Sequence, residues 1–328
     1  MLLRRTLLLA LALLALVGCS KRSGDAPAGA AAAPVAKVKL ALDWVPEPEF
    51  GGFYAARETG VYARYGLDVE ILGGGAGVPV VQMVASGRAE FGTTGADAVV
   101  MARARGADVV ALFASFQTSP QAILVHASRG LRSLGELFEK GGTLALEPGL
   151  PYAAYLRAKY GFDRMQIVPY DGGIARFLSD AGHAQQCFVT SEPLAARRKG
   201  SDPQTFLVAD AGFDPYATVV VTRRELLARE PERVRAFVLA TAEGWRAYGE
   251  DPRATNAAMG KLNPAMDAAT FAEAAAAQRP LVETDETRRA GIGAMTRARW
   301  ETLARQLAEL HIVDRAPPAD DLFVTVAR

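Results

Sequence analysis

The sequence predicts an α/β protein with two lobes, each a mainly parallel sheet flanked by helices. Short strands with alternating or continuous apolar residues take turns with amphipathic helices from residue 37 onward, which is typical of parallel sheets covered by helices on both faces. The alternation then restarts near residue 122, so we expect two similar units. A chain of 328 residues is long enough for both, since domains usually hold roughly 100–200 residues.

The first series of elements runs from residue 37 to residue 114. Residues 37–43 and 67–72 alternate polar and apolar side chains, as half-buried strands do, and a helix is expected between them at 50–65. After a glycine-rich turn at 73–77, Pro79 suits the first position of a helix, where its missing N–H is not needed. The remaining expected elements are that helix through residue 86, a strand at 90–94, a helix at 96–105 and a strand at 109–114.

The second series has the same alternation, and a helical region follows it. Its strands are expected at 122–125, 143–146, 166–170, 186–190, 205–209 and 218–222, and its helices at 131–138, 151–160, 173–179 and 192–199. Pro231 then opens a long helix, and a second helix follows near the C-terminus. Each has one apolar face, made by Val234, Phe237, Val238, Trp245 and Tyr248 in the first and by Trp300, Leu303, Leu307 and Leu310 in the second. We expect these residues to pack in the core.

The N-terminus predicts export. An apolar run at 7–17 follows two arginines; it is shorter than the ~20 residues that span a bilayer as a helix, but it suits a signal-peptide core. The run ends in Leu-Val-Gly-Cys at 16–19, which resembles the lipobox of bacterial lipoproteins. This resemblance implies a signal peptide at 1–18, a lipid on Cys19 and anchoring to a bacterial membrane on its periplasmic or outer side; the alternative is a plain signal peptide. Residues 19–36, rich in Ala, Gly, Ser and Pro, predict a flexible tether.

Composition and motifs exclude several classes of function. With 37 Lys+Arg against 36 Asp+Glu, the net charge of +1 gives no electrostatic reason to bind nucleic acid. The three histidines are isolated, and neither a metal-ligand spacing nor a phosphate-binding or nucleophile motif is present, so no metal, cofactor or catalytic residue is predicted. Cys187 lies in an apolar strand pattern and is expected to be buried and inert.

Polar and aromatic residues follow the predicted strands, at the sheet edge where open α/β sheets bind ligands. Asp43 and Trp44 end the first strand, and Glu192 follows a strand of the second series. An indole face and carboxylates that accept from ring amines suit a flat nitrogen heterocycle, which we expect Trp44 and Glu192 to clamp from opposite lobes. The predicted ligand contacts are Asp43, Trp44, Tyr54, Thr94, Asp97, Gln117, Gly149, Tyr152, Tyr170, Glu192 and Tyr216.

This set contains no lysine or arginine, which favours a neutral or cationic heteroaromatic solute over an oxyanion. An anion remains an alternative, because helix N-termini near Gly77, Gly95 and Gly149 could bind one without a basic side chain.

Five stretches resemble one family, the solute-binding proteins of ABC importers for thiamine-pyrimidine precursors, nitrate, sulfonates and taurine, which is related to fungal pyrimidine-precursor synthases. They are Leu-Asp-Trp-Val-Pro at 42–46, Gly-Gly-Phe-Tyr-Ala-Ala at 51–56, Tyr-Gly-Leu-Asp-Val-Glu-Ile at 65–71, Val-Ala-Ser-Gly-Arg-Ala-Glu-Phe-Gly at 84–92 and Thr-Ser-Glu-Pro at 190–193.

The resemblance implies a periplasmic-binding fold of the second type and a monomer that is not an enzyme. One lobe would comprise 37–122 plus 219–328 and the other 123–218. Solute would sit in the cleft between them, and importer permease subunits would recognise the closed form.

The Asp-Trp-x-Pro motif resembles the pyrimidine-precursor branch. That branch usually has an Asn and a His where this chain has Glu47 and Phe50. The departure leaves a larger heteroaromatic such as a flavin open, with nitrate, sulfonate or taurine as the alternative. The synthases carry a cysteine-rich motif and a reacting histidine that this chain lacks, so an enzyme on this fold is the second alternative.

Overall fold

The computed structural model describes residues 35–326, which form one compact unit. The predicted signal peptide, Cys19 and nearly all of the tether lie outside the described residues. No helix in the described part of the chain is long and apolar enough to cross a membrane.

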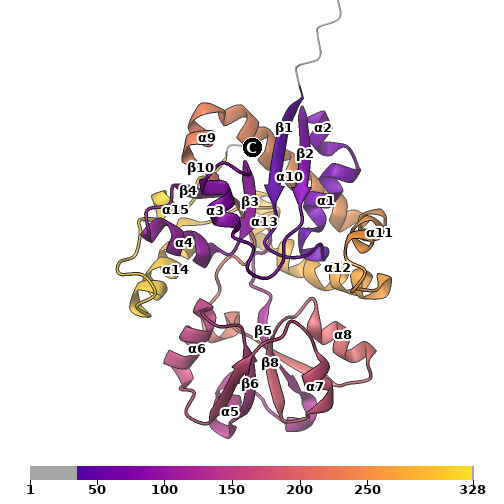
Figure 1. The fold of residues 1–328 in the computed structure, drawn as a ribbon, viewed down its shortest axis with the longest axis vertical. Helices are drawn as coiled ribbons and strands as arrows, with labels where there is room; N and C mark the ends of the chain where they lie inside the picture. The colour runs from indigo at the N-terminus through magenta and orange to yellow at the C-terminus, as the bar shows by residue number, and fades with distance from the viewer. Residues whose placement is uncertain (1–34, 327–328) are drawn as a thin grey trace, which may run out of the picture. The chain divides into compact units, whose positions relative to one another are not determined.

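The first sheet has five strands in the order β2-β1-β3-β10-β4. Strand β1 pairs in parallel with β2 and β3, whereas β10 runs antiparallel to both β3 and β4. Four strands therefore point one way and β10, which comes from much later in the chain, points the other (Figure 1). The strands are β1 (Ala36–Ala41), β2 (Leu67–Leu72), β3 (Phe91–Thr94), β4 (Val109–Ala114) and β10 (Val219–Arg223).

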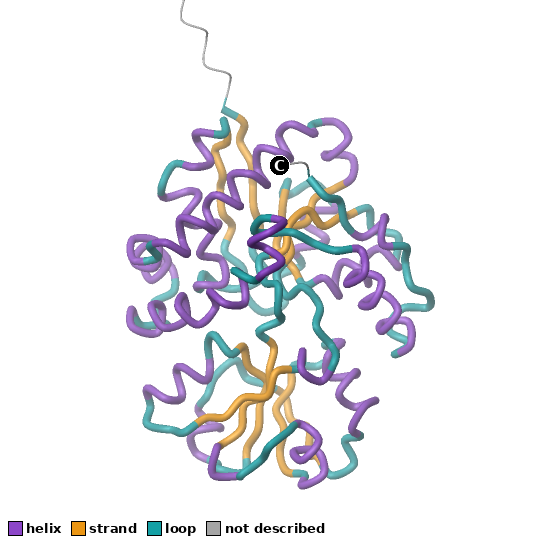
Figure 2. The backbone as a smooth tube through the Cα atoms, turned by 180° about the vertical axis from the view of Figure 1, so that it is seen from behind, coloured by secondary structure: helices purple, strands orange, loops and turns teal. Residues whose placement is uncertain are grey.

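The second sheet repeats this plan in the order β7-β6-β8-β5-β9. Strand β6 is parallel to β7 and β8, and β5 is the reversed strand, antiparallel to β8 and β9. Figure 2 shows helices on both sides of this sheet. Its strands are β5 (Gln121–His126), β6 (Gly142–Leu146), β7 (Met165–Pro169), β8 (His183–Phe188) and β9 (Pro203–Leu207). The predicted α/β class with two mainly parallel sheets is confirmed, with one reversed strand making each sheet mixed.

The helices lie close to where the sequence predicts them. The α-helices are α1 (Gly51–Glu58), α2 (Val61–Arg64), α3 (Val80–Ala85), α4 (Ala96–Ala104), α5 (Leu134–Lys140), α6 (Pro151–Tyr160), α7 (Ala175–Ser179), α8 (Glu192–Arg198), α9 (Arg224–Arg229), α10 (Pro231–Glu250), α11 (Arg253–Leu262), α12 (Ala268–Val282), α13 (Asp285–Ala290), α14 (Arg297–Glu309) and α15 (Ala319–Leu322). Short 3-10 turns are η1 (Pro48–Phe50), η2 (Ala127–Arg129) and η3 (Ala209–Ala211).

Three predicted boundaries are wrong, each for a local reason. The helix expected at 50–65 is broken, because Gly60 adopts a left-handed φ of 71° between α1 and α2. Helix α5 starts later than predicted, at Leu134, because the Ser133 side chain caps it by accepting from the backbone N–H of Glu136. Strand β8 starts earlier than predicted, at His183, because polar residues such as Gln185 are buried in it and hide the apolar pattern.

The core beside the first sheet depends on close packing between α1 and α10. Gly52 has no side chain, and a Cβ there would lie 2.2 Å from the Trp245 ring, so the two helices can approach only with glycine at this position. The Phe237 ring stacks on Phe91 with ring centroids 3.9 Å apart. The five residues predicted to form the apolar face of α10 are all buried, as is Trp300 on α14, which confirms their role in packing.

Candidate functional site

A pocket of about 380 Å³ lies where strands of both sheets end. From the first sheet, Asp43 and Trp44 follow β1, and Thr94 ends β3 just before α4. From the second sheet, Tyr170 follows β7 and Glu192 begins α8. We call this the acidic pocket. Its other lining residues are Glu47, Glu49, Gly95, Asp97, Ala98, Met101, Gln121, Glu147, Gly149, Leu150, Pro151, Gln186, Cys187, Phe188, Ser191, Ala217 and Thr218.

Seven of the eleven predicted contacts line the acidic pocket, and they come from both sheets. The seven are Asp43, Trp44, Thr94, Asp97, Gly149, Tyr170 and Glu192. The sequence rule that brings them together is that parallel strands present their carboxyl ends at one edge of a sheet.

Two predicted contacts are core residues instead. Tyr54 on α1 is 1% exposed, and the Arg57 guanidinium lies 4.9 Å from its ring centroid. Tyr216 is also 1% exposed, and its hydroxyl accepts from the backbone N–H of Thr296 at 2.9 Å. Neither side chain lines the pocket. Both rings are turned into the core, which is why neither contacts the pocket.

The other two predicted contacts lie close to the pocket but are used within the protein. The Gln117 amide donates to the backbone carbonyls of Ala114 and Ala294, which fixes the segment between β4 and β5. The Tyr152 hydroxyl donates to Gln186 Oε1 at 2.7 Å. Gln186 does line the pocket, so Tyr152 can act on it only by holding that amide in place.

The prediction missed two acidic residues, Glu47 and Glu49. Pro46, Pro48 and Phe50 are buried while the two glutamates between them are only half-buried, so the segment has the alternation of a half-buried strand. Buried amides hold the apolar side: Asn263 Nδ2 donates to the Pro46 carbonyl and Gln278 Nε2 to the Pro48 carbonyl. The alternation of Pro and Glu was the signal available in the sequence.

Six carboxylates line the acidic pocket: Asp43, Glu47, Glu49, Asp97, Glu147 and Glu192. No lysine, arginine or histidine is among its described lining residues. Burial raises the pKa of Asp43, although the Thr93 hydroxyl, which donates to its Oδ1 at 2.5 Å, opposes the rise. Burial also raises the pKa of Asp97, and a bond from the Ala98 N–H opposes it. The pocket therefore concentrates negative charge in a poorly solvated space.

Glu47 and Glu192 face each other from the two sheets. Burial, followed by the nearby Glu192 charge, raises the pKa of Glu47 to about 7, while hydrogen bonds from the Trp44 and Ser191 side chains oppose the rise. The pKa of Glu49 is also raised well above its ordinary value, by burial and then by the charge of Glu47. Glu47 thus lies close to Trp44 on its own side of the pocket and to Ser191 on the other.

Glu192 is held in a fixed orientation. Its Oε1 accepts from the Tyr170 hydroxyl at 2.6 Å, and its Oε2 accepts from the Phe188 N–H at 2.9 Å. Burial raises its pKa, and these two bonds oppose the rise. Each oxygen keeps lone-pair capacity for a further donor.

The side chains that line the pocket are better suited to binding a ligand than to catalysing a reaction. Burial raises the pKa of the Cys187 thiol well above its usual value, which favours the protonated, unreactive form. The predicted burial of Cys187 is confirmed by its 2% exposure. No imidazole lies among the described lining residues to activate Cys187 or Ser191. In residues 35–326, no three His, Cys, Asp or Glu side chains are arranged to hold a metal ion.

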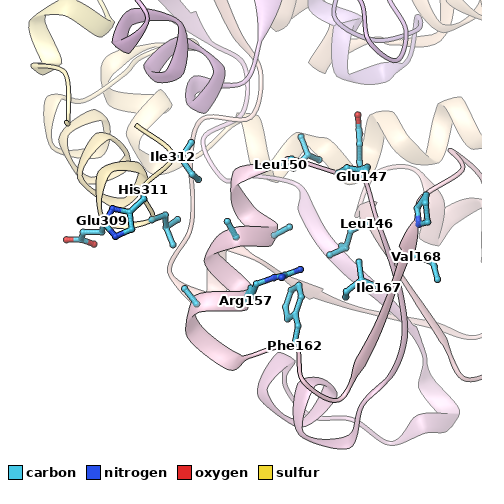
Figure 3. A pocket seen from close by; sticks show the side chains of 17 residues that line it. Leu146, Glu147, Leu150, Arg157, Phe162, Ile167, Val168, Glu309, His311 and Ile312 are labelled. Carbon is cyan, nitrogen blue, oxygen red and sulfur yellow. The ribbon is translucent and has the colours of Figure 1, made fainter. Parts of the chain in front are cut away.

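A larger groove, of about 860 Å³, adjoins the acidic pocket and shares Glu147, Gly149 and Leu150 with it. Apolar side chains of α6 and β7 and the turn after α14 line most of it, and Figure 3 shows Glu147 pointing away from them. The Arg157 guanidinium lies 5.0 Å from the Phe162 ring centroid. With few polar groups to orient a heterocycle, this groove is a weaker candidate for the primary site.

Known proteins similar to this chain are mostly binding proteins. A family model described as NMT1/THI5 like matches residues 47–255. The riboflavin-binding protein RibY of Chloroflexus aurantiacus is 29% identical over 71% of this chain and 71% of its own length. A formylaminopyrimidine-binding protein of Halalkalibacterium halodurans is 23% identical over 88% of this chain and 90% of its own length.

Solved structures share the fold at low sequence identity. The periplasmic aliphatic sulphonate binding protein SsuA of Escherichia coli has a TM-score of 0.69 at 15% identity and covers 90% of this chain and 94% of its own. The desulfurization enzyme DSZB has a TM-score of 0.61 at 15% identity and covers 88% of this chain and 96% of its own. The periplasmic-binding-protein fold is thus shown, and it hosts both binding proteins and an enzyme.

Proposed function

We propose that this chain, which belongs to the NMT1/THI5-like family, is the extracytoplasmic solute-binding component of an ABC importer. In this proposal, it captures a small heteroaromatic solute in the acidic pocket as a monomer and delivers it to the permease subunits. The observation that carries the proposal is the make-up of the pocket, whose described lining residues include Trp44, Tyr170 and six carboxylates but no basic side chain. Rings offer faces for stacking, and carboxylates accept from ring N–H groups.

The named relatives support the same class of solute. One is named for riboflavin and the other for formylaminopyrimidine, both flat nitrogen heterocycles. The volume of about 380 Å³ lies at the lower end of the range for small-molecule pockets, and the adjoining groove gives room for a longer solute that passes residues 147–150.

The pocket gives less support to the two alternatives. A sulfonate or nitrate needs cationic groups or free helix N-termini, and the first turns of α4 and α8 already hold Asp97 and Glu192. The N-terminus of α6 at Pro151 has no acid in its first turn, but it shares the pocket with six carboxylates, which repel an anion. The likeness to SsuA, at 15% identity, concerns the fold alone. A reaction on this fold would need an activated nucleophile, which the protonated Cys187 thiol does not supply.

Trp44 provides the test. We expect riboflavin or an aminopyrimidine to raise the melting temperature and to quench tryptophan fluorescence, because the other two tryptophans, Trp245 and Trp300, are buried in the core. Trp44→Ala should weaken binding by ~1–3 kcal/mol, by analogy with base–aromatic stacking. Trp44→Phe is the matched control, since it keeps a ring face but removes the fluorophore. Tight binding of taurine or nitrate with no response to pyrimidines or flavins would reject the heteroaromatic class.

We propose further that a lipid on Cys19 tethers the folded unit to the membrane. The support is the Leu-Val-Gly-Cys sequence at the end of the apolar run and the Ala-, Gly- and Pro-rich segment that follows. Cys19→Ala should release the protein into the soluble fraction or block its processing. A variant that remains membrane-bound and is cleaved normally would reject the lipid anchor.

A further inference from the structure

Within residues 35–326, no lysine, arginine or histidine lines the acidic pocket, and none forms an ion pair with its carboxylates. The groups that perturb Asp43, Glu47, Glu49, Asp97 and Glu192 are other carboxylates, hydroxyls, an indole N–H and backbone amides. Charged groups that leave water are normally paired, because burying an isolated charge is costly. In this pocket, a proton or a bound molecule must compensate the negative charge of the carboxylates.

Two of these acids lie at the N-termini of helices, where the helix dipole is positive. Asp97 lies in the first turn of α4, and Glu192 is the first residue of α8. The positive ends of these helices thus stabilise carboxylates of the protein. A third helix N-terminus, that of α6 at Pro151, borders the pocket without an acid in its first turn. Six carboxylates and no basic side chain are among the described lining residues, so the charge that the pocket still lacks is positive.

Glu47 is the acid best placed to interact with a charged group of the solute. It lies close to side chains on both walls, Trp44 and Ser191, and so beside the Trp44 ring that the proposed function uses for stacking. A positive ring stacked there would relieve the repulsion between Glu47 and Glu192. A neutral ring would leave it unchanged.

We propose that the solute of the acidic pocket carries a positive charge and that Glu47 is the residue that selects it. This inference rests on the proposed solute-binding function and narrows the class to a heteroaromatic cation, such as a quaternised ring or a ring bearing a protonated amine. It sets this chain apart from relatives named for neutral heterocycles.

Proton release follows from the same geometry. The pKa of Glu47 near 7 means that, in the empty pocket at neutral pH, a proton occupies this carboxyl about half of the time. A cation must displace that proton, so its affinity should rise about 10-fold between pH 6 and pH 8. The titratable groups that face the pocket with Glu47 are Asp43 after β1, Glu49 in η1, Asp97 in α4, Glu147 after β6, Tyr170 after β7, Cys187 in β8 and Glu192 in α8.

The experiment compares a cationic heterocycle with two neutral ones, of which the first is a fused-ring derivative of the cation. Thiamine carries a permanent positive charge, and thiochrome, its flat oxidation product, is neutral; riboflavin is the neutral reference. Calorimetry on the full-length protein should show thiamine binding at least about 10-fold more tightly than thiochrome. Titrations in buffers of different ionisation enthalpy should detect proton release with thiamine alone.

Variants at two glutamates assign the effect. Glu47→Gln should weaken thiamine about 10- to 100-fold and abolish its pH dependence, while the affinity for neutral rings changes less than about 3-fold. Glu70→Gln, which removes an exposed carboxylate from β2, is the matched control and should leave every affinity unchanged.

The outcomes distinguish a failure of the charge selection from a failure of the proposed solute-binding function. If riboflavin or thiochrome binds as tightly as thiamine, or if Glu47→Gln leaves thiamine binding intact, the charge selection is wrong and the solute-binding function stands. If none of the three rings binds, the proposed function fails and the selection fails with it.

Discussion

The ligand-free protein should become more stable when Glu47 is replaced by glutamine, and the gain should depend on pH. The folded state raises the pKa of this carboxyl from the ordinary 4.5 to about 7, so the folded protein holds a proton there that the unfolded chain has released. Between these two values, each rise in pH favours the unfolded chain. The wild type thus loses stability as the pH rises through this window, and Glu47→Gln, which cannot ionise, does not.

The size of the effect follows from the shift. One pKa unit corresponds to about 1.4 kcal/mol, so the full shift from 4.5 to about 7 sets an upper limit of about 3.5 kcal/mol. Glu47 is only half-buried at the wall of a pocket that water can enter, which screens part of the interaction. We expect Glu47→Gln to raise the free energy of unfolding by about 1–2 kcal/mol at pH 8 and to have no effect below about pH 4.5.

Urea unfolding of the ligand-free protein at several pH values between about 5 and 8 measures this difference directly. Glu70→Gln on β2 serves as the control, because it removes an exposed carboxylate outside the pocket and should give a stability curve parallel to that of the wild type. A variant at Glu47 that is less stable than the wild type at pH 8, or a gain that is the same at every pH, would show that Glu47 is not strained by its neighbours.

Three further predictions concern other parts of the molecule. Glu192→Gln keeps the shape of the side chain and loses its charge, so calorimetry should show an amine-bearing ring weakened by ~1.5–3 kcal/mol and a sulfonate bound as well or better; unchanged affinity for every solute would remove Glu192 from the site. The buried Cys187 thiol should react with iodoacetamide at neutral pH only after unfolding, and rapid labelling of the folded protein, seen by mass spectrometry, would contradict its burial. Gly52→Ala should destabilise the fold by ~1–3 kcal/mol, since its Cβ would meet the Trp245 ring; Gly73→Ala, whose Cβ would meet open space, is the control, and equal unfolding midpoints would refute the packing argument.

The fold was largely predictable because it depends on patterns that act locally. Strand β2 at Leu67–Leu72, strand β4 at Val109–Ala114 and helix α6 at Pro151–Tyr160 lie where alternation, apolar runs and an N-terminal proline place them. The errors arise where one residue overrides a pattern, as Gly60 does by adopting a left-handed conformation. The reversed strands β5 and β10 were not predictable, because their direction is set by how the chain passes between the sheets and not by their composition.

The candidate site was only partly predictable, for a related reason. The strand-end rule found Asp43, Trp44 and Glu192, because it needs only the order of strands and helices. The sequence does not tell whether an aromatic ring faces the pocket or the core, which is why Tyr54 in α1 and Tyr216 before β10 were misplaced. The strand-end rule also missed Glu47 and Glu49, since their orientation depends on amides supplied by residues more than two hundred positions later.

The preference of the pocket for one charge comes from its loops and not from its fold. In an open α/β fold, helices that follow strands point their positive ends at the ligand cleft, which by itself favours anions. This chain places Asp97 and Glu192 at two of those ends and adds Glu47 and Glu49 from the loop after β1. These acidic residues at strand ends reverse the electrostatic preference of the pocket, while the strands keep the arrangement of the fold. A shared fold with a sulphonate-binding protein is therefore compatible with a solute of opposite charge here.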